Sequence, residues 1–340
     1  MFPEETVLVG FLIGAAIGSF LNVLIYRMPR GLSISSPAYS FCPSCKTPLG
    51  LADLIPLFSW LFSKGRCRYC GSKVASRYFW VEMANGLIYA GIWWNYLVAG
   101  QEPAYAIAYA LAASMLVAII WIDWEFYIIP DEINAFLWFI GILLNIFFWA
   151  GRLPQAFTWG MPTALTGWLM GVGVLWGIAF LGRVVFRKDA MGHGDIKMAR
   201  GIGAVLGPIP ALLSFGLAVI LGAVIGMVQV ATLKGKQAPE PEVEEDDEPY
   251  EPESIGSLLK CGLGYVLLID ILGLFFPKLY ENWFGEPLRA EIMEEDDFEV
   301  THTMIPFGPY LALGAIVAVV FQSQLLGLVD SYLNWVTPNP

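Results

Sequence analysis

Two aspartates, Asp123 and Asp195, are the residues of this chain best suited to acid–base chemistry. Asp123 closes an apolar run within WIDWEFYIIPDEI, and Asp195 opens another within MGHGDIKM. A carboxylate at a membrane boundary among aromatic residues is costly and is usually kept for a functional reason. Counted from the N-terminus, the chain crossings bring both carboxylates to the same membrane face. The pair therefore predicts hydrolysis by an aspartic dyad that shares one water.

In such a dyad, an ionised carboxylate takes a proton from water while its protonated neighbour polarises the scissile carbonyl. Two like charges close together in apolar surroundings cannot both ionise, so this mixed state persists near neutral pH. Gly192 and Gly194 flank His193 and would let a substrate backbone approach Asp195. Lys197 is two residues from Asp195, a spacing that does not bring side chains together on a helix.

Other acidic residues have simpler interpretations. Asp131 follows Pro130 and suits the first turn of a helix as a cap. Glu125 and Asp189 fit solvated loop positions. On residue types alone, a dyad of Asp123 and Asp195 stays one interpretation beside these simpler ones, because Gly-x-Gly-Asp by itself is a weak pattern.

Four cysteines form two CxxC pairs with a spacing typical of metal sites. Cys42 and Cys45 lie in CPSC, Cys67 and Cys70 lie in CRYC, and 21 residues separate the pairs. Two disulfides are the alternative, but the charge pattern places this loop in the reducing cytosol, where disulfides are rare. Four thiolates would fill the coordination sphere of Zn²⁺, so the ion is predicted to be structural. Cys261, alone in an apolar stretch, is expected to be an inert buried thiol.

The composition requires membrane helices to position these groups. Of 340 residues, 57% are hydrophobic and 14% charged, which indicates an all-α polytopic membrane protein. With two histidines, at positions 193 and 302, a multi-histidine metal centre is excluded. About eight transmembrane helices are predicted, with a small cytoplasmic zinc-ribbon-like loop domain. The segments are 7–26, 83–99, 104–122, 133–150, 161–181, 196–207, 209–233 and 305–326.

Charges around the first segment decide its nature and orientation. Glu4 and Glu5 precede it, and Arg27 and Arg30 follow it, whereas a signal peptide carries its positive charge first. The segment is therefore predicted to span, with its N-terminus outside the cytoplasm. Basic residues at 66–77, 183–188 and 234–236 then all fall on the cytoplasmic side.

The first helix also carries features for packing. Gly10, Gly14 and Gly18 recur every four residues and would let another helix approach closely. Asn22, near the end of the same helix, needs a polar partner. A helix–helix hydrogen bond and a role in a site both remain open for it.

Six motifs, in this order, resemble those of type IV prepilin peptidases, also called leader peptidase/N-methyltransferases. They are GSFLNVLIYRMPRG, CPSCKTPL, CRYCGSKVASRYFWVE, IDWEFYIIPDEI, GHGDIKM and IPFGPYLALGA. The resemblance extends through most of residues 1–235 and resumes at 305. This family belongs to the GxGD-type membrane aspartic proteases.

The resemblance implies that Asp123 and Asp195 are the catalytic pair and that Asp131 has a supporting position. Similar enzymes cut the basic leader of prepilins or pseudopilins after a glycine at the cytoplasmic face. They then methylate the new N-terminus with S-adenosylmethionine. The cysteine loop favours this bifunctional interpretation, although the chain has no glycine-rich methyl-donor fingerprint. The alternatives are a peptidase only, an ion-coupled transporter using paired aspartates, and a structural scaffold.

The resemblance also suggests how the chain is organised. We expect a first transmembrane helix at 1–28, a zinc-binding loop domain at 29–80 and a peptidase core at 81–235. An acidic insertion at 236–304 precedes a last helix and tail at 305–340. The expected location is the bacterial inner membrane, and the expected partners are prepilins or pseudopilins, the lipid bilayer and a pilus or secretion assembly protein.

The insertion dominates the charge balance. Residues 237–304 contain 18 of the 30 acidic residues and 3 basic ones, so the rest of the chain is slightly basic and nucleic-acid binding is not expected. Residues 240–253 and 294–297 are predicted to be solvated, and the former disordered. The apolar stretch 255–276 is long enough to cross, but crossing would strand Lys260 and Asp270 in lipid. An interfacial or re-entrant segment is therefore the preferred prediction.

Overall fold

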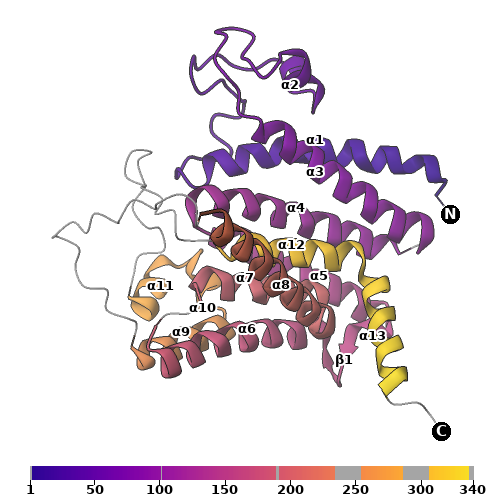
Figure 1. The fold of residues 1–340 in the computed structure, drawn as a ribbon, viewed down its shortest axis with the longest axis vertical. Coiled ribbons are helices and arrows are strands. Elements are labelled where there is room, and N and C mark those ends of the chain that lie inside the picture. The colour runs from indigo at the N-terminus through magenta and orange to yellow at the C-terminus, as the bar shows by residue number, and fades with distance from the viewer. Residues whose placement is uncertain (1, 101, 189–190, 234–253, 286–305, 337–340) are drawn as a thin grey trace.

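Helices form most of the structure, a computed structural model shown in Figure 1. It describes residues 2–100, 102–188, 191–233, 254–285 and 306–336. The longer helices are α1 (Val7–Arg27), α3 (Arg77–Ile92), α4 (Pro103–Phe126), α5 (Asp131–Ala150), α6 (Thr163–Leu181), α7 (His193–Leu206), α8 (Pro208–Leu233), α12 (Gly308–Val320) and α13 (Gln322–Val336). The shorter ones are α2 (Phe58–Phe62), α9 (Ile255–Val266), α10 (Ile269–Gly273) and α11 (Pro277–Phe284).

Single turns and one small hairpin complete the described chain. Stretches of π-helix continue α3 at Trp93–Ala99 and α6 at Gly182–Phe186. Three-residue 3₁₀ helices lie at Glu4–Thr6, Leu51–Asp53 and Pro154–Ala156. Strands β1 (Phe157–Thr158) and β2 (Met161–Pro162) pair antiparallel just before α6.

Within the described residues, five helical segments are long and apolar enough to cross a membrane. They are Glu4–Arg27, Pro103–Phe126, Asp131–Ala150, Thr163–Phe186 and Pro208–Val228. A sixth is reached if α12 and α13 count as one broken span, so the predicted number of eight is not confirmed. The helix α7 has only 14 residues and includes Asp195, Lys197 and Arg200. The predicted final segment, 305–326, is not continuous, because α12 ends at Val320 and α13 leaves it at 86°.

The glycine face of α1 packs against α3, as the sequence predicts. A Cβ on Gly14 would lie 2.6 Å from the Cβ of Tyr89, and one on Gly18 would lie 2.7 Å from the Cα of Glu82. At these distances only glycine lets the two helices meet. Asn22 donates to the carbonyl of Tyr78, so the helix–helix interpretation of this residue is confirmed. Figure 1 shows α1 and α3 side by side.

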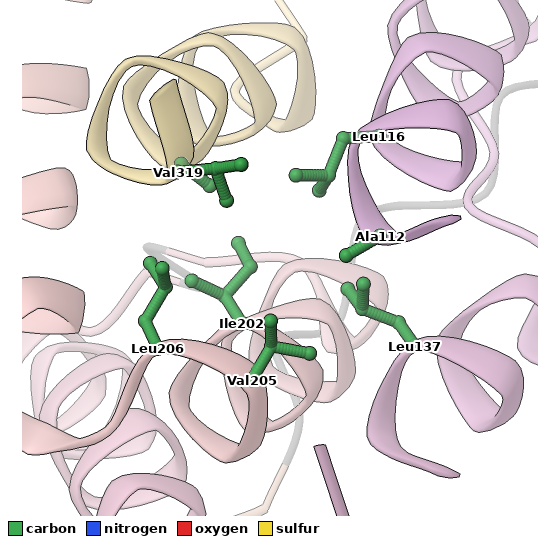
Figure 2. Close-up of a pocket in the computed structure, with 8 residues that line it drawn as sticks. Ala112, Leu116, Leu137, Ile202, Val205, Leu206 and Val319 are labelled. Carbon is green, nitrogen blue, oxygen red and sulfur yellow. The ribbon is translucent and has the colours of Figure 1, made fainter. Parts of the chain in front are cut away.

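The helix α7 lies at the centre of the bundle, because small residues let α5 and α6 approach its backbone. A Cβ on Gly167 of α6 would lie 1.9 Å from the carbonyl oxygen of Gly203, and one on Gly141 of α5 would lie 2.4 Å from that of Ala204. On another side of α7, aliphatic side chains of α4, α5, α7 and α12 pack against one another, as Figure 2 shows. Ala112, Leu116, Leu137, Ile202, Val205, Leu206 and Val319 line this contact. It has no polar lining and leaves no room for a water molecule, so it is core and not a ligand site.

The apolar stretch 255–276 does not form one spanning helix. It breaks into α9, of 12 residues, and the short α10. Together with α11 these helices gather beside α6 and α7 (Figure 1). Cys261 is buried in α9, as expected for a structural thiol. The acidic stretches 240–253 and 294–297 lie outside the described residues.

Candidate active site

Asp123 and Asp195, which are 72 positions apart in the sequence, come together at one end of the bundle. Asp123 lies three residues before the end of α4 and is 5% exposed, and Asp195 lies in the first turn of α7. Ile129 connects them: its side chain lies against Gly194 of α7 and against Gly308 at the start of α12. The charge of Asp123 acts on the carboxyl group of Asp195. The ends of α4, α7 and α12 therefore lie together around Ile129, which places both aspartates at the same end of the bundle.

Backbone amides hold both carboxyl groups. The amide of Gly308 donates to Asp123, and the amide of Gly192 donates to Asp195. A Cβ on Gly308 would lie 2.4 Å from Oδ2 of Asp123, so this close approach requires glycine. Oδ1 of Asp195 is buried and has no hydrogen-bond partner among the described residues. Asp195 thus keeps one oxygen uncommitted, while the N-termini of α7 and α12 favour negative charge at this place.

Asp131 supports the site through an ion pair. It is the first residue of α5, and its two carboxylate oxygens accept from Nζ of Lys197 at 2.9 and 2.8 Å. The side chains of both residues are largely buried, at 16% and 7% exposure. The interpretation of Asp131 as a cap is incomplete, because the residue also neutralises the lysine two positions after Asp195.

Two further contacts, one at each end of the 29–76 loop, hold it against the end of α4. Arg77, at the start of α3, forms an ion pair with Glu125. The guanidinium of Arg30 lies 5.0 Å from the ring centre of Phe126. The sequence predicted that Glu125 is a solvated loop charge. This prediction is wrong, because Glu125 lies within α4 and pairs with Arg77. Asp189 lies outside the described residues.

The four predicted metal ligands converge. The sulfurs of Cys42, Cys45, Cys67 and Cys70 all lie within 4.8 Å of one another, and all four thiols are free. Those of Cys42 and Cys70 are 3.9 Å apart, close to the separation that tetrahedral Zn–S bonds of about 2.3 Å impose. The disulfide alternative finds no support in this arrangement.

The local backbone explains the convergence. Each CxxC pair forms a knuckle, in which the amide of the first cysteine donates to the carbonyl five residues on, Thr47 or Ser72. The residue after each second cysteine, Lys46 or Gly71, has a positive φ.

Hydrogen bonds at Cys42 suit metal binding. Burial tends to raise its pKa, but hydrogen bonds from the backbone amides of Cys45 and Ser44, with smaller ones from side chains, lower the pKa to about 6. A thiolate, the form that binds zinc, is therefore accessible at neutral pH.

The sequence did not reveal three of the contacts around α7. Gly308 was visible only as part of IPFGPYLALGA. Asp270 was visible as a lone acid in an apolar stretch, but not as the partner of Arg200. Tyr265, which shares a 2.8 Å hydrogen bond with Nδ1 of His193, carried no sequence signal.

These observations define a class of protein: a helical membrane protein with two carboxyl groups meeting at one end of its bundle and a four-cysteine loop beside them. The chain belongs to the type IV leader peptidase family. The model of that family matches residues 110–227, and the model of the bacterial peptidase A24 N-terminal domain matches residues 12–96. The first match includes both aspartates, and the second includes all four cysteines.

Curated relatives lead to the same family. The prepilin leader peptidase/N-methyltransferase of Klebsiella pneumoniae is 35% identical over 203 residues, which cover 58% of this chain and 83% of the relative. The protein of the same name from Stutzerimonas stutzeri is 30% identical, covering 69% and 84%. That of Myxococcus xanthus is 31% identical over 319 residues, covering 90% and 87%. No solved structure gives a significant match to this chain.

The predicted family is therefore confirmed, and the chain is an enzyme of the peptidase and methyltransferase type that its relatives' names describe. The transporter and scaffold alternatives have no support from these relatives.

Proposed function

We propose that this protein is an aspartic endopeptidase of the inner membrane that removes the basic leader of type IV prepilins or pseudopilins. Cleavage follows a glycine at the cytoplasmic face, with Asp123 and Asp195 as the catalytic pair. The observation that carries the proposal is the meeting of these two carboxyl groups at the shared end of α4, α7 and α12. A prepilin with its leader in the cytoplasm and its apolar helix in the bilayer presents its scissile bond at this depth.

The chemistry follows from the two carboxyl groups. One carboxylate takes a proton from water as the water oxygen attacks the scissile carbonyl carbon. The other, protonated, donates a hydrogen bond to the carbonyl oxygen as that oxygen gains charge. The tetrahedral intermediate then breaks its C–N bond, and the new amine leaves with a proton from the pair. The titration belongs to both groups, so neither aspartate is assigned a fixed role.

The cysteine knuckles are proposed to bind one structural Zn²⁺ and so to fold a zinc-ribbon-like loop. Zinc would supply cross-links between the two knuckles and no open coordination position for chemistry. Methylation of the new N-terminus by S-adenosylmethionine is proposed from the names of the relatives.

The proposed topology places the N-terminus of this chain outside the cytoplasm. The chain crosses the membrane up to eight times if α3, α7 and α12 also traverse it.

Cleavage of a purified prepilin by the purified full-length chain in detergent tests the peptidase. Asp123→Asn and Asp195→Asn should each lower kcat by about 10³-fold or more while the protein stays folded. Asp330→Asn makes the same chemical change on the exposed face of α13 and should leave kcat unchanged. Full processing by either of the first two variants would exclude the mechanism.

Mass spectrometry of the cleaved pilin, with and without S-adenosylmethionine, tests methylation. The expected product gains one methyl group on its new N-terminus. A product without this mass increase reduces the proposed function to a peptidase.

A further inference from the structure

Three residues on one face of α7 form hydrogen bonds with the helices α9–α11. The residues of α7 that make them are His193, Lys197 and Arg200, spaced i, i+4 and i+7, which places them on one side of the helix. Each of these residues bonds to a side chain between residues 265 and 280, and Arg200 also donates to the backbone carbonyl of Tyr265 at 3.2 Å. Asp195 lies between the first two in the sequence and faces the other side.

The strongest of the three is a buried ion pair. The two terminal nitrogens of Arg200, Nη1 and Nη2, donate to Oδ1 and Oδ2 of Asp270, each at 2.7 Å. The side chains are 0% and 2% exposed. Among the described residues, Asp270 is the only acid that pairs with Arg200. A buried guanidinium without a counter-charge is strongly destabilising. The buried charge of Arg200 on α7 is therefore neutralised by Asp270 of α10.

The other two bonds lie nearer to the catalytic carboxyl group. The hydroxyl of Tyr265 shares a 2.8 Å hydrogen bond with Nδ1 of His193, two residues before Asp195. Nζ of Lys197, two residues after Asp195, donates to the hydroxyl of Tyr280 at 3.3 Å. The first turn of α7 is thus held on both sides of Asp195.

The insertion is itself fastened to the bundle. Nε1 of Trp176, on α6, donates to the carbonyl of Leu258 on α9 at 3.0 Å. Gly262 of α9 lies so close to the ring of Trp176 that a Cβ there would be 2.3 Å from Nε1. The helices α9–α11 therefore connect α6 to α7.

We propose that α9–α11 form a brace that positions α7, and thereby Asp195, with Tyr265 and Asp270 as positioning residues. The predicted effect of the brace on catalysis rests on the proposed function, whereas the positioning of α7 does not. Tyr265 and Asp270 touch no reacting atoms: they fix the rotation of α7 and the height of its first turn. The chemistry at Asp123 and Asp195 is unchanged.

Three variants of the full chain test the brace. Tyr265→Phe removes one hydroxyl and keeps the aromatic contact with Phe284. Asp270→Asn keeps the shape and removes the charge, and Asp270→Glu retains the charge. Trp283→Phe is the control, because its lost hydrogen bond, to the carbonyl of Lys260, stays within the insertion.

Two readouts are measured: kcat and KM for prepilin cleavage, and amide hydrogen exchange of the peptide that contains residues 193–206. In Tyr265→Phe we expect kcat to fall about tenfold, with KM and the thermal midpoint unchanged and faster exchange in α7. Asp270→Asn should have a larger effect on both, and Asp270→Glu should recover part of kcat. Trp283→Phe should match the wild type.

Unchanged exchange in α7 in both Tyr265→Phe and Asp270→Asn would overturn the brace, whatever kcat does. An equal effect of Trp283→Phe would also overturn it, since the contact would then not be specific to α7. If Asp270→Asn does not fold, Tyr265→Phe decides the matter. If the wild type cleaves no prepilin, the proposed function fails, whereas the exchange comparison still decides the brace.

Discussion

Replacing Gly171 by alanine tests whether the close contact of α6 with α7 places the catalytic helix. A Cβ at this position would lie 2.1 Å from the carbonyl oxygen of Ala199, whereas ordinary contact begins at 3.4 Å. Because the obstacle is backbone, α6 and α7 must separate by roughly 1 Å, and Ala199 is about one helical turn from Asp195. A shift of this size in a catalytic group lowers kcat by about 100-fold, and overpacking costs about 1–3 kcal/mol of stability.

Gly173 provides the matched control, since it lies on the same helix and a Cβ there meets nothing within 4 Å. Gly173→Ala should keep kcat and raise helix stability by up to about 1 kcal/mol. Both variants are compared by prepilin cleavage and by thermal unfolding in detergent. Wild-type kcat in Gly171→Ala, or equal losses in the two variants, would refute the argument from packing.

Three further outcomes follow. Gly308→Ala should lower kcat by about 100-fold with a smaller loss of stability, because the new Cβ displaces the Asp123 carboxylate; unchanged cleavage kinetics would contradict the role of this glycine. Asn85→Ala should cost about 1 kcal/mol in unfolding experiments and leave kcat unchanged, since its Nδ2 donates to the Gly14 carbonyl between α1 and α3, away from the aspartates. Metal analysis should find about one zinc per chain, lost in the Cys42→Ser, Cys67→Ser double variant. The pKa of Cys42 is lowered to about 6, so protons compete with zinc for its thiolate as the pH falls through that value; a zinc affinity, measured against a chelator, that is the same at pH 7 and pH 5 would argue against thiolate ligation.

Features that depend on neighbours in the chain were predictable. The two CxxC knuckles close on their own amide hydrogen bonds, so their spacing was sufficient to predict a four-sulfur cluster. The glycines of α1 recur at helical spacing and therefore share a face, which α3 covers. The location of Asp123 and Asp195 at helix ends followed from where apolar runs stop and start. Each of these inferences uses a periodicity of the backbone, which is a local property.

Contacts across long separations in the chain were not predictable. Spacing says nothing about the pairing of Arg200 with Asp270, which are 70 positions apart, or about the amide of Gly308 that holds Asp123. The predicted number of spans is also not confirmed, because hydropathy does not show that α7 is surrounded by helices or that α12 bends into α13. The sequence thus identified which groups are candidates for chemistry, since residue type and local spacing are read directly from the chain. The mutual placement of these groups, and the brace that α9–α11 form against α7, depend on which buried charges pair when the helices pack. That pairing is a property of the whole fold.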